Sequence, residues 1–266
     1  YSEAWKAAGL EVGIWLSAFG HGGVLAHAEQ GAPLPYGKLM GPRGGTAGDS
    51  FCPLDPDYRE AYCRMVAIYA EAHPDLLMLD DDFRISQHGE SPCCFCELHM
   101  ARIREICGED ITREELNKLA FKGEKNKYRD ADLKAQGESL ELLARDIRAE
   151  VDKVNPKVSL SACSAYCSWD LDGTDPIRLT KIFAGENKAF LRLHGAPYWA
   201  PHNGKPVEAI PEIERMFASF CKDEDIEIFS EGDVYPRPRY NVPSKVLEIF
   251  DLVLIAANEG DGILNY

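Results

Sequence analysis

The sequence predicts an α/β fold, and two observations lead to this prediction. Short apolar runs that suit buried strands alternate along the whole chain with longer stretches of helical spacing. Most of the apolar runs end in polar or charged residues, as strands do at the active face of a barrel enzyme. We therefore expect a (β/α)8 TIM barrel. The first strand is not found before Ser2 and no helix follows the last strand, so the expected barrel is incomplete at its N-terminus and lacks its final helix.

The expected strands are short apolar runs bounded by turn residues. A long loop is expected over 31–50, which is rich in glycine and proline and has no periodicity. No Gly-x-Gly-x-x-Gly follows the first run, so a nucleotide-binding sheet is the less favoured alternative. Six runs are clear and a seventh is open near 49–52; the six are 12–16, 76–79, 158–162, 189–193, 226–229 and 263–266.

Helices are expected between these runs, and two of them carry strong start signals. Asp55 before Pro56 is a good N-cap and first-turn pair for a helix over 56–72. Thr112 and Glu115 have the spacing of a capping box. The charged stretch 121–132 is expected to be an exposed insertion. The other helical stretches are 2–8, 93–106, 139–154, 175–185, 210–221 and 243–257.

The composition limits the classes of function. The 266 residues are 45% hydrophobic and carry a net charge of −15, which suits one globular domain over 1–266. Because the sequence opens on Tyr1, we expect it to be a piece of a longer chain. No block of lysine and arginine is present for nucleic acid, and no apolar run is long enough to span a membrane. We expect the protein to bind neither nucleic acid nor a membrane, and the sequence leaves association into a homo-oligomer open.

Nine cysteines, an odd number, are scattered along the chain. This favours unpaired thiols in a cytoplasmic protein over a disulfide framework. Cys93, Cys94, Cys96 and His99 form an unusual local group that suits buried thiols better than a metal or a redox role, because neighbouring cysteines point apart. We predict no metal and no organic cofactor, and metal binding by this group stays open.

Two separated acidic positions point to chemistry at the strand ends. Asp80, Asp81 and Asp82 close one run, and alternation places Asp80 and Asp82 on one face. Crowded carboxylates raise one another's pKa and keep one of them protonated, as a general acid requires, although an acidic cap or a divalent metal site would also use them. Glu231 follows another run. An acid and a second carboxylate are the arrangement that hydrolyses glycosides.

Aromatic and basic residues near the strand ends suit a carbohydrate. Sugar faces stack on aromatic rings, and basic groups bond hydroxyls. The expected substrate-binding residues are Asp80, Asp81, Arg84, His194, Trp199, Tyr235 and Arg237.

The run Leu79-Asp80-Asp81-Asp82-Phe83 resembles the strand-4 motif of clan A glycoside hydrolases, where an Asn-Glu pair precedes an aromatic residue. On this resemblance Asp82 is the acid/base, Asp81 takes the Asn position, and Glu231 matches the nucleophile at the end of strand 7. The order of elements is similar to beta-galactosidase-like barrels and related uncharacterised bacterial glycosidase-like proteins. The resemblance implies a bacterial glycosidase of carbohydrate metabolism. Asp82 stands where the family has glutamate and Asp81 where it has asparagine, and in both respects the sequence departs from the family pattern.

Two other functions stay open. A divalent-metal-dependent sugar isomerase or epimerase would use Asp80 or Asp82, His194 and Glu231 as ligands. A non-catalytic carbohydrate-binding domain would use the same carboxylates as hydrogen-bond acceptors. For the glycosidase we expect Asp82 and Glu231 in one pocket, about 5 Å apart if it retains and roughly 6.5–9.5 Å apart if it inverts configuration. Glu231 is expected to stay ionised beside Arg237 or another cation. We also expect an open gap between the first and last strands.

Overall fold

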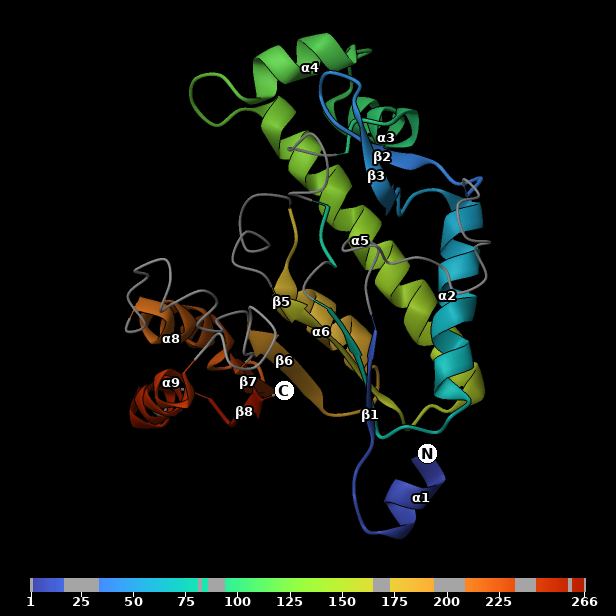
Figure 1. Cartoon of the computed structure of the whole chain (residues 1–266). Helices are drawn as coiled ribbons and strands as arrows, with labels where there is room; N and C mark the ends of the chain where they lie inside the picture. The colour runs from blue at the N-terminus through green and yellow to red at the C-terminus, as the bar shows by residue number, and fades with distance from the viewer. Residues whose placement is uncertain are drawn as a thin grey trace. The chain divides into compact units, whose positions relative to one another are not determined.

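A computed structural model of the chain describes residues 2–16, 34–80, 83–85, 94–164, 173–193, 209–232, 243–257 and 260–265. The chain divides into two compact units, Tyr1–Asn187 and Lys188–Tyr266. Each unit contains three neighbouring parallel strands accompanied by helices (Figure 1). The α/β class and all six expected strands are confirmed, whereas the gap in the barrel and the single domain stay predictions.

The strands of the first unit are ordered β1-β4-β5. Gly13 of β1 pairs with Leu76 of β4, which in turn pairs with Ser159 of β5. Leu77 and Leu79 belong to the main core cluster, while the alternate residue Met78 is buried outside it. One face of these strands is therefore packed against the helices. The bounds are Gly13–Leu16 for β1, Leu76–Leu79 for β4 and Ser159–Ser164 for β5.

Three helices cover that face: α2 (Pro56–Ala70), α5 (Lys127–Val154) and α6 (Pro176–Ala184) (Figure 1). Asp55 caps α2 through the backbone N–H groups of Asp57 and Tyr58, as expected. Gly173, with φ +69°, lies so close to α5 that a Cβ there would be 1.8 Å from the Leu133 carbonyl oxygen. The turn before α6 thus requires glycine. The short α1 (Ser2–Ala7) precedes β1.

A hairpin and two short helices complete the first unit near the start of α5 (Figure 1). The predicted loop over 31–50 is wrong in part, because β2 (Lys38–Met40) and β3 (Thr46–Phe51) pair antiparallel. Gly44, with φ +90°, makes the turn, and Leu39 and Phe51 anchor the hairpin in the core. The short helices are α3 (Glu97–Cys107) and α4 (Arg113–Ala120), and the predicted capping box at the start of α4 is present.

Two predicted boundaries in this region are wrong. α3 begins at Glu97 instead of residue 93, because Cys96 is extended and occupies the N-cap position. α5 begins at Lys127, so half of the predicted insertion over 121–132 is helix. Its residue Asp132 is 1% exposed. Charge in a sequence does not distinguish a solvated loop from an amphipathic helix start.

The second unit has the strand order β6-β7-β8, with α8 (Ala209–Cys221) and α9 (Ser244–Ala257) beside it (Figure 1). β7 continues past the predicted end at Phe229, because Ser230 and Glu231 still pair with Ile263 and Leu264 of β8. Ser230 faces a cavity of about 190 Å³ that α8 and α9 also line. The strand bounds are Ala189–Leu193 for β6, Ile226–Gly232 for β7 and Gly262–Asn265 for β8.

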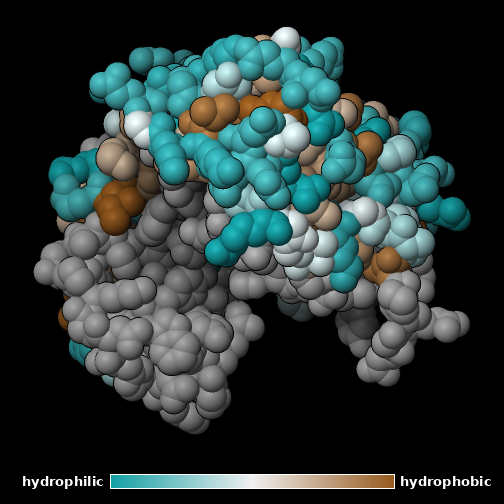
Figure 2. All heavy atoms as spheres, turned by 90° about the horizontal axis from the view of Figure 1, so that it is seen from above, coloured by the Kyte–Doolittle hydropathy of each residue, from teal (hydrophilic) through white to brown (hydrophobic). Residues whose placement is uncertain are grey.

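The face of the protein in Figure 2 is mostly hydrophilic where it is coloured, with small apolar patches, which agrees with the high net charge. Among the helices of the described ranges, none combines the length and the apolar character that crossing a membrane requires.

Candidate functional site

Three of the nine predicted site residues lie in the described part of the chain: Asp80, Arg84 and Glu231. Asp80 directly follows β4, is half-buried, and donates its backbone N–H to the Leu16 carbonyl oxygen at 2.9 Å. Arg84 is buried in the same unit. The other six lie outside the described residues, and these are Asp81, Asp82, His194, Trp199, Tyr235 and Arg237. The pairing of Asp82 with Glu231 therefore stays a prediction.

Glu231 is paired with an arginine that the sequence analysis did not single out. Arg192 Nη1 of β6 lies 2.8 Å from Glu231 Oε1 of β7, and the two side chains are 1% and 2% exposed. A buried carboxylate of this kind is stable only with a compensating charge and hydrogen bonds. The predicted cation beside Glu231 thus exists, and in the described part of the unit it is Arg192.

The strand pairing explains why these two side chains meet. Arg192 is in register with Phe229, and alternation puts Phe229 and Glu231 on one face of β7. The rings of Phe190 and Phe229 lie edge to face on that face, with centroids 6.3 Å apart. Ser230 points to the opposite face, where its hydroxyl bonds the Glu214 carboxylate. Glu231 is therefore on the face away from α8 and α9, above an apolar pair of rings.

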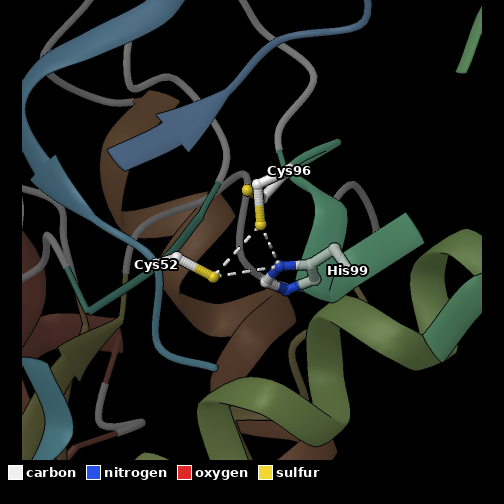
Figure 3. Close-up of side chains that lie close together, drawn as sticks. Cys52, Cys96 and His99 are labelled. Atoms are coloured by element: carbon white, nitrogen blue, oxygen red, sulfur yellow. Dashed lines mark hydrogen bonds between the residues drawn. The ribbon is translucent and has the colours of Figure 1, made fainter. Parts of the chain in front are cut away.

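A second polar cluster lies in the first unit, where Cys52, Cys94, Cys96 and His99 bring four ligand atoms within 4.8 Å of one another. All four residues are buried. Figure 3 shows the side chains of Cys52, Cys96 and His99 pointing toward one another. His99 Nδ1 lies 3.2 Å from Cys52 Sγ and 3.5 Å from Cys96 Sγ, and the two sulfurs are 3.4 Å apart.

Two separate segments build this thiol cluster, by which we mean Cys52, Cys94, Cys96 and His99. Cys52 follows β3, Cys94 and Cys96 precede α3, and His99 lies in the first turn of α3. The Phe95 backbone N–H donates to the Met40 carbonyl oxygen at 2.7 Å, and the Met40 N–H reaches Cys94 Sγ at 3.4 Å. The hairpin thus holds the segment before α3 in place.

The hydrogen bonds of His99 assign its tautomer. Ser139 Oγ donates its single proton to the Gln136 carbonyl oxygen at 2.7 Å, so it can only accept from His99 Nε2, 3.1 Å away. The proton of the neutral ring is then on Nε2, and the lone pair of Nδ1 faces the sulfurs. A ligand histidine is commonly oriented in this way by a hydrogen bond from its other nitrogen.

The cluster favours one thiolate. Hydrogen bonds from Cys52 and Cys94 hold the pKa of the Cys96 thiol well below its ordinary value, and burial opposes this lowering only in part. Burial raises the pKa of Cys52 and that of Cys94. Three sulfurs and one imidazole nitrogen are the donor set of a tetrahedral zinc site, in which two sulfurs at ~2.3 Å from the metal lie about 3.8 Å apart. The residues therefore fit zinc.

This chain is similar to known proteins in its fold and not in its sequence. No protein-family model matches the sequence, and no curated protein matches it. The structure is similar to the β-amylase catalytic domain of Paenibacillus polymyxa, with a TM-score of 0.60 and 12% identity over 100% of this chain and 78% of that chain. The β-galactosidase of Halorubrum lacusprofundi gives a TM-score of 0.61 and 11% identity over 100% of this chain and 51% of that chain.

A β-galactosidase of Bacillus circulans sp. alkalophilus is also similar, with a TM-score of 0.53 and 14% identity over 86% of this chain and 37% of that chain. The chain has a TIM-barrel-like fold. These neighbours are glycoside hydrolases, and at such identities the likeness shows the fold alone. The chain spans about half or less of the two β-galactosidases.

Two residues of these sites were not predicted from the sequence, although one of them carries a signal there. Arg192 is the lone charge in the apolar run Ala189–Leu193, and a charge inside a buried strand needs a partner. Cys52 carried no such signal, because it is 44 residues from Cys96 in sequence. Cys93, which was grouped with the later cysteines, lies outside the described residues. The seven cysteines that are described carry free thiols, as expected.

Proposed function

We propose that the chain is the barrel of a glycoside hydrolase in which Glu231 is the nucleophile. The observation that carries this proposal is the place of Glu231, buried beside Arg192 near the carboxyl end of β7. Barrel enzymes carry their catalytic groups at this end of the strands. The likeness of the fold to glycoside hydrolases supports the reaction class.

In the proposed reaction the Glu231 carboxylate attacks the anomeric carbon while the bond from that carbon to the leaving oxygen breaks. The Asp82 carboxyl gives its proton to the leaving oxygen. A water molecule then attacks the same carbon, returns a proton to Asp82, and releases Glu231 as a carboxylate. Asp80, Asp81 and Arg84, with His194, Trp199, Tyr235 and Arg237, are proposed to bind the sugar.

The test uses the full chain and a panel of nitrophenyl glycosides. Glu231→Gln keeps the shape and removes the nucleophile, so we expect kcat to fall by roughly 10⁴-fold or more with an unchanged circular dichroism spectrum. Glu227→Gln is the matched control, since Glu227 lies on the same strand but pairs with Lys188 at the surface. It should leave kcat within a factor of about two, because an exposed pair contributes little. Equal losses in both variants would overturn the proposal.

The two rival functions predict different results. A divalent ion at Glu231 is disfavoured because its carboxylate already bonds a guanidinium. If the isomerase were correct, a chelator would abolish activity and the product would be an isomerised sugar. If the chain were a binding domain, glycan binding would survive Glu231→Gln and no glycoside would be hydrolysed.

We also propose that the thiol cluster binds one structural zinc ion. Four donor atoms from two segments far apart in sequence already converge, and the Ser139 hydrogen bond presents the correct nitrogen of His99. Four protein ligands close a tetrahedral shell and leave no position for substrate, which marks a structural rather than a catalytic site. The ion would fasten the hairpin to α3.

Zinc content by mass spectrometry tests this second proposal. We expect about one zinc per chain in the purified protein, in line with a single four-ligand site. Cys96→Ser should remove it, whereas Cys221→Ser, which changes a buried thiol of the other unit, should retain it. Substitution by cobalt should give the charge-transfer absorption of thiolate ligands. A zinc content that Cys96→Ser does not change would place the metal elsewhere.

A further inference from the structure

The proposed nucleophile is in an unusual electrostatic position, because almost no water reaches it. The Glu231 side chain is 2% exposed and lies above the rings of Phe190 and Phe229. Removing a carboxylate from water favours its neutral form, and a neutral carboxyl group is a poor nucleophile. A positive charge close to Glu231 is therefore needed to keep its carboxylate ionised for attack on a sugar.

The structure supplies that charge from the neighbouring strand. Arg192 is 1% exposed and 2.8 Å from Glu231, and it emerges from β6 instead of from a loop. Side chains on strands are held more precisely than those on loops. An arginine remains charged at all relevant pH values and holds a carboxylate with a planar group of donors.

We propose that Arg192 is the positioning residue of this site, which keeps the Glu231 carboxylate ionised and fixes its direction of attack; this role rests on the proposed glycosidase function. Arg192 acts through Glu231 and need not touch the sugar. Two effects are separable, because lysine can replace the charge but not the planar geometry of the guanidinium.

The other charged groups that the structure describes near β7 lie on other faces or at the other end of the strands. Glu214 of α8 contacts Ser230 on the opposite face, and α9, on that face, carries the half-buried Asp251. Glu227 pairs with Lys188 near the amino ends of the strands. The segment of β8 from Gly262 to Asn265 has no titratable side chain. Among the described residues, Arg192 is thus the group whose loss should change the ionisation of Glu231.

The first experiment measures kcat/KM for an aryl glycoside against pH. In Arg192→Met the acidic limb should move up by about 1–3 pH units, which is the usual effect of removing a charge at contact distance. We expect kcat/KM at neutral pH to fall by roughly 10²–10³-fold. Arg192→Lys should restore the position of the acidic limb but only part of kcat, because lysine returns the positive charge without the planar group of donors of the guanidinium.

Arg148→Met is the matched control. Arg148 is a buried arginine of the first unit that donates to the carbonyl oxygens of Val158 and Phe183. Its loss should lower stability but leave the pH profile in place. A profile that is the same in Arg192→Met as in the unchanged protein, with both folded, would overturn the proposal.

The second experiment does not depend on turnover. Glutamate labelled with carbon-13 at the carboxyl group gives a Glu231 resonance that Glu231→Gln identifies by its loss. We expect this resonance to titrate about 1–3 pH units higher in Arg192→Met. An unchanged midpoint would contradict the role of Arg192 even if glycosides are hydrolysed. If no glycoside is hydrolysed but the midpoint moves, the proposed function fails while the effect of Arg192 on Glu231 stands.

Discussion

Glu231 and Asp132 are both buried carboxyl groups, but the protein compensates them differently. Glu231 is 2.8 Å from the Arg192 guanidinium. Asp132, in α5, is 1% exposed and accepts a hydrogen bond of 2.6 Å from the Gln136 side-chain amide. Burial raises the pKa of Asp132 to about 7, and the hydrogen bond from Gln136 and the charge of Arg129 oppose this rise only in part.

The difference shows what distinguishes a carboxylate prepared for attack from one that is merely enclosed. A neutral amide satisfies one oxygen of Asp132 but does not offset the loss of hydration of a full negative charge. A guanidinium does offset it, at the cost of burying a second charge. Glu231 is therefore the better candidate for a nucleophile near neutral pH, whereas Asp132 is close to the point of protonation there.

The largest expected effect comes from breaking the Arg192–Glu231 pair. Arg192→Met and Glu231→Gln should each lower the free energy of unfolding by about 3–5 kcal/mol, because each leaves a buried charge without the opposite charge that compensates it. The double variant should lose less than the sum, by at least ~1 kcal/mol. Urea denaturation of the four proteins measures this coupling. Strictly additive losses would mean that the two side chains do not depend on each other.

The comparison also shows what the sequence could and could not predict. The six strands and the capped helices follow from local pattern, since apolar runs and residues such as Asp55 and Thr112 act over a few neighbours. The place of Glu231 near a strand end was predictable for the same reason. Its contact with Arg192 depends on the register of two strands 33 residues or more apart, which alternation alone does not set.

The thiol cluster could not be predicted in full for a similar reason, because its ligands come from segments that are far apart in sequence. Sequence spacing argued against a metal, because neighbouring cysteines point apart. In the structure Cys94 and Cys96 precede the helix in extended conformation, and Cys52 arrives from the end of β3. The fourth ligand is therefore provided by tertiary structure. The hairpin that delivers it was itself predicted as a loop, because its glycines hide the pairing of two short strands.

The second largest expected effect is a pH-dependent change in stability on substitution of Asp132. Its pKa is raised from 3.8 to about 7 on folding, so between these values the folded protein binds the proton that the unfolded chain releases. This contribution to stability is full below about pH 4 and falls as the pH rises to about 7. Asp132→Asn, which resembles the protonated acid, should therefore stabilise the protein at about pH 8 by no more than roughly 4 kcal/mol, and by nothing at about pH 4.

Thermal or urea unfolding at both pH values measures this difference. A stabilisation of equal size at low and high pH would show that asparagine improves packing and that Asp132 does not titrate as proposed. Asp132→Ala is a useful companion variant, since it removes the carboxyl group and also the acceptor for Gln136. It should stabilise less than asparagine at high pH, because the Gln136 amide then loses its partner.

The smallest expected effect is at the start of the same helix, where a polar contact reaches solvent. The Asn126 side-chain oxygen accepts from the backbone N–H groups of Tyr128 and Arg129 at 3.0 and 3.2 Å and caps α5. Asn126→Ala should cost about 1 kcal/mol, and Asn126→Ser should recover most of it, because serine caps helices nearly as well. Asn126 has no ionisable group, so the cost should be the same at about pH 4 and about pH 8, unlike that of Asp132→Asn six residues later. Urea denaturation of both variants at the two pH values measures it. A cost that changed with pH would mean that the cap is coupled to the buried carboxyl group, and the two contributions of α5 would then no longer be independent.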